Sequence, residues 1–273
     1  MGRTAVTGGS APTGPAPPAS DAVVVAAVGD IHLGTDSRGL LRPAFAVLPD
    51  CADLLLLAGD LTRHGTVEEA AVVAEELRGC GVPVVAVLGN HDYHSGQEAE
   101  VGRVLCDAGV VVLEGRSTVV SAGGHQVGVA GTKGFCGGFA GRSAGEFGEP
   151  EMKAFVRAAR QSAGRLAEAL AYLADRACDV RIALTHFSPV PDTLAGEPLE
   201  IYPFLGTYLL AEAIDSVGAD LAVHGHAHLG TEHGLTTGGV RVRNVAQPVI
   251  RHAFALYRLP VGPARATGAP PSP

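Results

Sequence analysis

The segment Val23–His32, VVVAAVGDIH, holds the pattern that decides the fold: an apolar run that ends in Gly, an acid and, two residues later, a histidine. Runs of this length, rich in β-branched residues and bounded by Gly, predict buried strands. Related patterns occur at Leu54–Arg63 (LLLLAGDLTR), Val84–Asp92 (VVAVLGNHD), Ile182–His186 (IALTH) and Leu221–His228 (LAVHGHAH). Five predicted strands therefore end in short polar clusters.

These clusters gather Asp, Asn and His at the carboxyl ends of neighbouring strands, where open α/β sheets place ligand sites. Oxygen and imidazole donors at one edge suit a divalent cation, and we predict a two-metal site. Each residue also has an ordinary interpretation. An Asp after a strand is more often a turn or capping residue, Asn90 suits a turn, and His186 alone suggests a core histidine. Those separate interpretations do not explain why all the clusters occur in one chain.

In this order, the clusters resemble the motif series of the calcineurin-like metallophosphoesterase superfamily. The matching positions are Asp-x-His at 30–32, Gly-Asp-x-x-Arg at 59–63, Gly-Asn-His-Asp at 89–92, His186, and Gly-His-x-His at 225–228. The resemblance implies an α/β fold, a four-layer α/β/β/α sandwich with two mixed sheets. An ordinary three-layer doubly wound sheet is the alternative. Two features favour two sheets. The short predicted strands from 110 to 130 look like the start of a second sheet, and two further strands, 240–245 and 254–259, are predicted near the end of the chain.

The resemblance also implies ligands for two divalent metal ions, with one carboxylate shared between them. One set is Asp30, His32, Asp60 and His228, and the other is Asp60, Asn90, His186 and His226. A carboxylate suits the shared position because its two oxygens can bridge cations about 3.5–4 Å apart. The sets contain no thiolate and favour Mn²⁺, with Fe²⁺ or Zn²⁺ as alternatives, over Ca²⁺.

Three further motif residues, His91, Asp92 and Arg63, have implied catalytic roles. His91 is the histidine that does not bind metal, and it stabilises the transition state or protonates the leaving oxygen. Asp92 is expected to orient His91, since a carboxylate partner fixes a histidine's tautomer. Arg63 either contacts phosphate or braces the Asp60 loop.

The implied function is metal-dependent hydrolysis of a phosphoric ester bond in a small phosphorylated substrate. We favour a phosphodiesterase, because Asp-x-His together with Gly-Asn-His-Asp also occurs in the group resembling bacterial class III cyclic-nucleotide phosphodiesterases. Phosphomonoesterase and pyrophosphatase activities use the same kind of site and stay open. A non-catalytic scaffold of the same fold is a remote alternative, which the complete ligand set with His91 disfavours.

Composition limits the partners of the 273-residue chain. Its formal net charge is -8, and it contains no basic run of five residues, so an extended nucleic-acid surface is not expected. No apolar stretch approaches the roughly 20 residues that span a bilayer. The five cysteines lack close spacing and predict neither a disulfide framework nor a zinc knuckle. We expect a cytoplasmic protein. The sequence makes no prediction about its oligomeric state.

We expect one domain over residues 22–260, between flexible tails at 1–21 and 261–273. Strands are predicted at 23–28, 54–58, 84–88, 110–113, 118–121, 126–130, 182–185, 221–224, 240–245 and 254–259, and helices at 38–48, 66–78, 97–108, 151–176 and 207–217. Residues 131–148, with seven glycines, and residues 187–207 are predicted loops that govern substrate choice. Their aromatic residues, Phe135, Phe139, Phe187, Tyr202 and Phe204, either stack a base or pack the loops.

Overall fold

The structure, a computed structural model, describes residues 21–261, so the predicted tails lie outside the described residues apart from Asp21 and Val261. The strands are β1 Ala22–Val28, β2 Leu54–Ala58, β3 Val84–Val87, β4 Val111–Val112, β5 Arg116–Ala122, β6 His125–Thr132, β7 Gly138–Phe139, β8 Arg142–Ser143, β9 Val180–Thr185, β10 Leu221–His224, β11 His233–Leu235, β12 Arg241–Asn244 and β13 Ala255–Pro260. The α-helices are α1 Arg42–Phe45, α2 Val67–Glu76, α3 Glu98–Asp107, α4 Pro150–Ala174, α5 Tyr202–Leu205, α6 Tyr208–Val217 and α7 Gln247–Ile250. Short 3₁₀ helices lie at Leu48–Asp50, Asp192–Leu194 and Leu199–Ile201.

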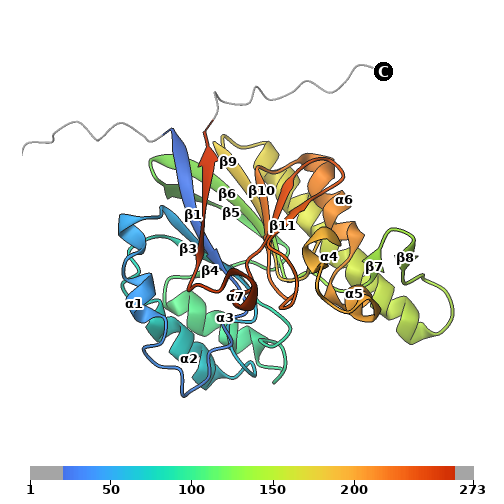
Figure 1. Ribbon diagram of the computed structural model, residues 1–273, viewed down its shortest axis with the longest axis horizontal. Coiled ribbons are helices and arrows are strands. Elements are labelled where there is room, and N and C mark those ends of the chain that lie inside the picture. The colour runs from blue at the N-terminus through green and yellow to red at the C-terminus, as the bar shows by residue number, and fades with distance from the viewer. Residues whose placement is uncertain (1–20, 262–273) are drawn as a thin grey trace, which may run out of the picture.

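Two large mixed sheets form the centre of the molecule (Figure 1). The first has the strand order β13-β1-β2-β3-β4, in which β1 to β4 are parallel and β13 is antiparallel to β1. The second has the order β11-β12-β10-β9-β6-β5, with a parallel centre and one antiparallel strand at each edge. In the first sheet Ala22 of β1 lies opposite Pro260 of β13, and the Val261 amide donates to the Asp21 carbonyl at 2.9 Å.

The two sheets pack face to face through one buried apolar cluster. Val85 and Leu56 of the first sheet belong to the same cluster as Val129 and Ile182 of the second. On the outer face of the first sheet, α2 and α3 contribute buried apolar residues to this cluster, while α4 and α6 pack on the second sheet through a separate cluster that includes Leu170 and Ile214. Helix, sheet, sheet and helix therefore form four layers, which confirms the predicted sandwich (Figure 1).

Local sequence explains where the main helices begin and end. Thr66 and Glu69 form a reciprocal capping box at the start of α2, in which each side chain accepts from the other residue's main-chain amide. Pro150 occupies the first turn of α4, where its missing amide hydrogen costs nothing. Gly218 ends α6 with φ of 83°, a conformation that glycine adopts without a Cβ clash.

The helix predicted over 38–48 is wrong: only α1 and the following 3₁₀ helix form in this segment. The buried Glu76 carboxylate accepts the main-chain amides of Gly39, Leu41 and Arg42, which holds this stretch as a loop. Pro43 has no amide hydrogen to donate. The interaction with Glu76 is a tertiary contact that the local sequence does not reveal.

Two sheet assignments also change. The predicted strand 110–113 begins no second sheet, because β4 pairs in parallel with β3 of the first. The predicted strands 240–245 and 254–259 do not pair with each other, since β12 joins the second sheet and β13 the first. Among residues 21–261, no helix combines the length and apolar character needed to cross a membrane. All five cysteines are free thiols.

Candidate metal centre

The five polar clusters of the sequence meet at the carboxyl ends of strands from both sheets. Asp30 and His32 follow β1, Asp60 follows β2, and Asn90 follows β3. His186 follows β9, and His226 and His228 follow β10. Because the two sheets pack face to face, residues separated by up to 198 positions are brought within hydrogen-bonding distance. The structure thus gathers all seven predicted metal ligands in one place.

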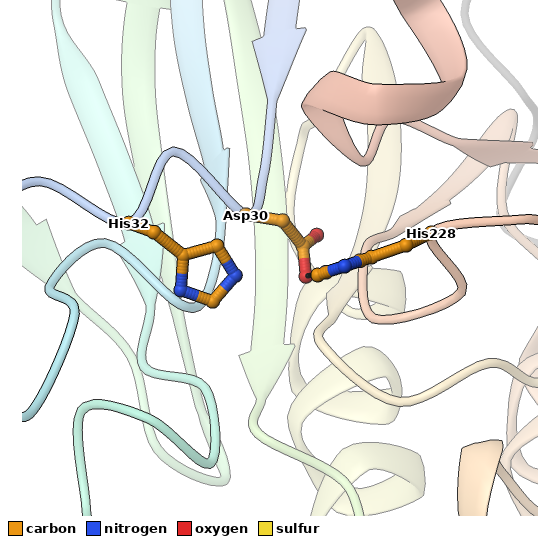
Figure 2. Close-up of side chains that lie close together, drawn as sticks. All are labelled: Asp30, His32 and His228. Atoms are coloured by element: carbon orange, nitrogen blue, oxygen red, sulfur yellow. Dashed lines mark hydrogen bonds and ion pairs between the residues drawn. The ribbon is translucent and has the colours of Figure 1, made fainter.

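The first group of potential ligands is Asp30, His32 and His228, whose donor atoms all lie within 4.8 Å of one another. His228 Nε2 donates to Asp30 Oδ1 at 2.9 Å, and both Asp30 oxygens accept the main-chain amide of His226. Figure 2 shows the His32 and His228 rings on either side of the Asp30 carboxylate. His32 Nε2 also lies 3.8 Å from Asp60 Oδ2, which connects this group to the second.

The second group is Asp60, His186 and His226, also within 4.8 Å of one another. His186 Nδ1 donates to the Ala58 carbonyl at 2.9 Å, and this bond fixes the tautomer because a carbonyl can only accept. His186 Nε2 therefore presents a lone pair, yet it faces the Asn90 Oδ1 acceptor at 2.8 Å and Asp60 Oδ1 at 3.4 Å. The free lone pair of His186 and these two side chains therefore lie close enough to bind one cation.

The backbone around the centre has left-handed torsions at four of the predicted ligands. The φ angles are 55° at Asp30, 41° at His32, 50° at Asp60 and 71° at His226. Non-glycine residues in this region cost about 1–3 kcal/mol each and cluster at functional sites. The fold therefore maintains a strained arrangement that places these side chains together.

Motif glycines permit the close approach of the loops. A Cβ on Gly89 would lie 2.1 Å from Asp60 Oδ1, and one on Gly225 would lie 2.2 Å from Asp30 Oδ2. A Cβ on Gly59 would lie 2.6 Å from His186 Nδ1. The glycines before Asp60, Asn90 and His226 are thus explained by the space that a predicted ligand of another loop occupies.

Burial keeps most histidines of the centre neutral. It lowers the pKa of His32 to about 4 and that of His226 to about 3, and it lowers the pKa of His186 well below 6.5. Burial raises the pKa of Asp30 to about 6, while the hydrogen bond to Asp30 raises the pKa of His228. Neutral imidazoles have the free lone pairs that metal coordination requires.

His91 lies at the edge of the centre, with 45% of its side chain exposed. Its Nε2 is 4.0 Å from Asp60 Oδ2, and its main-chain amide donates to Asp60 Oδ1 at 2.8 Å. Its Nδ1 donates to the Arg63 carbonyl at 2.9 Å. Because that bond uses the Nδ1 hydrogen, His91 can release a proton to a ligand at Nε2 only from its imidazolium form.

The expected role of Asp92 in orienting His91 is wrong. The fully buried Asp92 carboxylate accepts from the amides of Gly89, Leu61 and Thr62, and from the Thr62 hydroxyl at 2.6 Å. These bonds tie the loop after β2 to the loop after β3. The Arg63 carbonyl, not a carboxylate, holds the His91 ring.

Arg63 points its guanidinium to the exposed Asp36, with Nη2 3.1 Å from Asp36 Oδ1. The Arg63 amide donates to the Leu33 carbonyl at 3.1 Å, so the loops after β1 and β2 are also joined through its main chain. Of the two roles considered for Arg63, these contacts correspond to bracing the Asp60 loop.

Lys133 is a neighbour of the centre that the sequence did not single out. Its carbonyl accepts the amides of His186 and Phe187 at 3.0 Å each. Its ammonium lies 4.9–5.2 Å from the ring centres of Tyr93, Phe135 and Phe187, and burial lowers its pKa. Backbone acceptors and ring contacts have no sequence signal, so Lys133 could be recognised only in the folded chain.

His224, at the end of β10, supports the centre from the interior. It is fully buried, with Nδ1 2.7 Å from the Gly225 carbonyl and Nε2 2.8 Å from the Thr193 hydroxyl. Gly225 and His226 follow it directly, so this network fixes the start of the last ligand loop. His64 and His94, which lie just after the motifs at 59–63 and 89–92, contact each other at 6.2 Å between ring centres and are not in the ligand groups.

Four of the five loop aromatics pack within the protein. Phe139 and Phe187 are buried, Phe135 stacks edge-on against Phe155, and the Tyr202 hydroxyl donates to the Leu194 carbonyl. Phe204 differs, because 59% of it is exposed. Packing is therefore the main role of these aromatics, with Phe204 as the exception.

The donor set fits divalent metal ions. Among the described residues, His32 Nε2 is the buried side-chain nitrogen or oxygen that has no hydrogen-bond partner, and it points into the first ligand group. A buried polar atom without a partner is costly unless a ligand satisfies it. Carboxylate, amide and imidazole donors together suit Mn²⁺, Fe²⁺ or Zn²⁺.

Comparison with protein families gives one match: the model described as calcineurin-like phosphoesterase matches residues 23–230. A comparison with curated proteins found no match. Similar solved structures include phosphopantetheinyl hydrolase from Mycobacterium tuberculosis, with 18% identity, TM-score 0.57, and coverage of 84% of this chain and 90% of that one. Protein TT1561 of Thermus thermophilus has 20% identity, TM-score 0.55, and coverage of 88% and 100%. A putative 5'-nucleotidase from Staphylococcus aureus has 17% identity, TM-score 0.52, and coverage of 88% and 54%. At these identities, the structural similarity shows the fold alone.

Proposed function

This chain belongs to the calcineurin-like phosphoesterase family, and on that premise we propose that it is a dinuclear metal-dependent phosphoesterase that hydrolyses a small phosphorylated substrate. We further propose that the substrate is a phosphodiester. The proposal rests on the family membership and on the chemistry of the seven side chains that converge at the candidate metal centre.

One observation carries the proposal: Asn90 Oδ1 and Asp60 Oδ1 lie 2.8 Å and 3.4 Å from the unprotonated Nε2 of His186. The His186 proton is on Nδ1, where it is bonded to the Ala58 carbonyl. The free imidazole nitrogen and the two oxygens are ligand atoms of the kinds that Mn²⁺, Fe²⁺ and Zn²⁺ bind. A cation at this point would bind all three.

We assign two ions to the centre. Asp30, His32, Asp60 and His228 would hold one, and Asp60, Asn90, His186 and His226 the other. The Phe204 carbonyl lies 3.3 Å from His226 Nε2 and holds that hydrogen, which leaves His226 Nδ1 for the metal. When bound, the two ions polarise a phosphoryl oxygen and make water nucleophilic near neutral pH.

The chain's own groups complete the reaction around the ions. His91 Nε2 faces the centre beside the shared carboxylate, where its imidazolium can donate a proton to the leaving oxygen. Asp92 and Arg63 act indirectly by joining the ligand loops. Lys133 adds positive charge near His186 of the second group.

We favour a diester because Asp-x-His at 30–32 together with Gly-Asn-His-Asp at 89–92 also occurs in the group resembling bacterial class III cyclic-nucleotide phosphodiesterases. The one arginine in the motifs, Arg63, is paired with Asp36.

The test compares bis-p-nitrophenyl phosphate with p-nitrophenyl phosphate, using protein stripped with EDTA and then supplied with single metals. We expect activity to disappear with the metal and to return best with Mn²⁺, with Fe²⁺ or Zn²⁺ second and Ca²⁺ inactive. Hydrolysis of the diester at the higher rate would support the diesterase. Full activity in the stripped protein would disprove the metal mechanism, and hydrolysis of the monoester alone would replace the diesterase with a phosphomonoesterase.

A further inference from the structure

A cavity of about 830 Å³ lies between the β7–β8 hairpin and the first turns of α4 and α5. Its lining includes Arg142 from the hairpin, Met152 and Phe155 from α4, and Pro203 and Phe204 from α5. In Figure 1 these three elements project together from the side of the molecule. The cavity has the size of a pocket for a small organic molecule.

The cavity adjoins the metal centre. Phe204, which lines it, places its carbonyl 3.3 Å from Nε2 of the ligand His226. A row of rings also joins the two regions. His226 contacts Phe187 at 4.4 Å between ring centres, Phe187 contacts Phe135 at 6.1 Å, and Phe135 contacts Phe155 at the cavity wall at 5.3 Å. Phe204 therefore contacts a predicted metal ligand through its main chain and also lines the cavity.

Apolar side chains are unusually exposed around this opening. Phe204 is 59% exposed and Met152 is 40% exposed. Apolar surface gains about 25 cal/mol per Å² when it leaves water, so these side chains favour an apolar occupant.

We propose that this cavity binds an apolar group, at least as large as an aryl ring, that is attached to the phosphorus of the substrate held at the metal centre. The proposal rests on the proposed function, since it names the substrate class of the same site. The metals would then select the phosphoryl group, and the cavity would select the ester by its organic part. Phe204 contributes to both regions, with its carbonyl at His226 and its ring in the cavity.

Two non-hydrolysable ligands of equal charge test the proposal: methylphosphonate and (1-naphthylmethyl)phosphonate. Their dissociation constants are measured by isothermal titration calorimetry on the Mn²⁺-loaded full chain. We expect the naphthyl ligand to bind at least about tenfold more tightly, in line with what apolar pockets discriminate. Phe204→Ala and Met152→Ser should each reduce that ratio several-fold, while Leu40→Ala, a change at a 67% exposed leucine away from the cavity, should preserve it.

The outcomes separate the two proposals. Equal binding of both phosphonates, or an unchanged ratio in folded Phe204→Ala and Met152→Ser proteins, would overturn the cavity assignment and leave the metal centre standing. If neither phosphonate binds the loaded protein, phosphoryl binding at the metal centre is refuted and the cavity assignment falls with it. Circular dichroism of each variant confirms that the ratio is measured on folded protein.

Discussion

The metal centre and the cavity beside it are in contact, but their side chains are held in different ways. In the centre, Asp30, Asp60 and His186 are at most 2% exposed, and hydrogen bonds to the main chain of other loops fix them. In the cavity, Phe204 and Met152 are exposed and come from the first turns of α5 and α4. Changes in the centre should therefore affect every substrate, whereas changes in the cavity should alter the choice between substrates.

The strongest way to test this contrast is Asp60→Asn, which replaces the shared carboxylate by an amide. A neutral amide bridges two cations poorly, and each ion contributes several kcal/mol to the transition state. We expect a loss of at least about 10⁴-fold in kcat/KM for methyl and aryl diesters alike. Metal analysis should show fewer than two ions per chain. Asp50→Asn, at an exposed position, is the control, and two tightly held ions in the Asp60 variant would refute the bridging assignment.

His91→Ala separates proton transfer from metal binding within the centre. We expect unchanged metal content and a rate lower by about 10²–10⁴-fold, because a general acid contributes this much. The loss should be largest for alkoxide leaving groups and smaller for p-nitrophenolate, which departs readily as an anion. Exposed His94→Ala is the control. Equal losses for both leaving groups would assign His91 to positioning the phosphoryl group instead.

Gly89→Ala tests whether the close approach of the loops is needed. The new Cβ would lie 2.1 Å from Asp60 Oδ1, so the loop or the carboxylate must move. Overpacking of this kind costs about 1–3 kcal/mol, or about 2–10 °C in Tm for a chain of this size. Metal content should fall as well. Gly164→Ala in α4, where a Cβ meets nothing within 4 Å, should be neutral or stabilising. An unchanged Tm with two bound ions in Gly89→Ala would contradict the steric argument.

The smallest expected effect is a pH dependence of stability that arises from His224 beside the metal centre and not from the cavity. Burial lowers the pKa of His224 to about 3, so the folded protein leaves it neutral while the unfolded chain protonates near pH 6.5. Stability contributed by neutral His224 is complete above pH 6.5 and is lost as pH falls towards 3. In metal-free wild-type protein, the free energy of unfolding should fall between pH 6.5 and pH 5. His224→Gln should reduce that fall by about 2 kcal/mol.

Urea unfolding at the two pH values measures this difference. The other buried histidines titrate in both proteins, so their contributions cancel in the comparison. His233→Gln, at a side chain that is 67% exposed, serves as the matched control. Identical pH dependence in wild type and His224→Gln would show that His224 is not held neutral by the fold.

The contrast between the metal centre and the cavity also explains which features the sequence could predict. Motif spacing placed each ligand at a strand end, and parallel strands bring their carboxyl ends together whatever the details of packing. The residues that gather at the candidate metal centre were therefore recognisable before the fold was known. The role of Asp92 was not, because adjacent residues in a tight loop point in different directions: its carboxylate bonds Thr62 while the His91 ring bonds the Arg63 carbonyl. Every residue has a main-chain carbonyl, so the sequence does not show which carbonyl holds the His91 ring.

The cavity was invisible in the sequence for a related reason. Its walls come from positions near 142, 152 and 204, which share no period or motif and meet only through the packing of α4 and α5. The segment 131–148 was expected to be loop, yet it contains the end of β6 and the β7–β8 hairpin that forms one wall. Likewise, the pairing of β13 with β1 depends on long-range contacts and could not be read from the final strands themselves.

That pairing has a practical consequence for engineering the protein. Asp21 and Val261 are joined by a main-chain hydrogen bond at the start of β1, whereas the metal centre lies beyond the opposite end of that strand. A short glycine–serine linker could connect these two residues, and new ends could be opened at Gly124 in the β5–β6 turn. Such a circular permutant should keep the edge that carries the candidate metal centre unobstructed. A tether attached at Asp21 or Val261 would likewise hold the protein on a surface with that edge facing the solution.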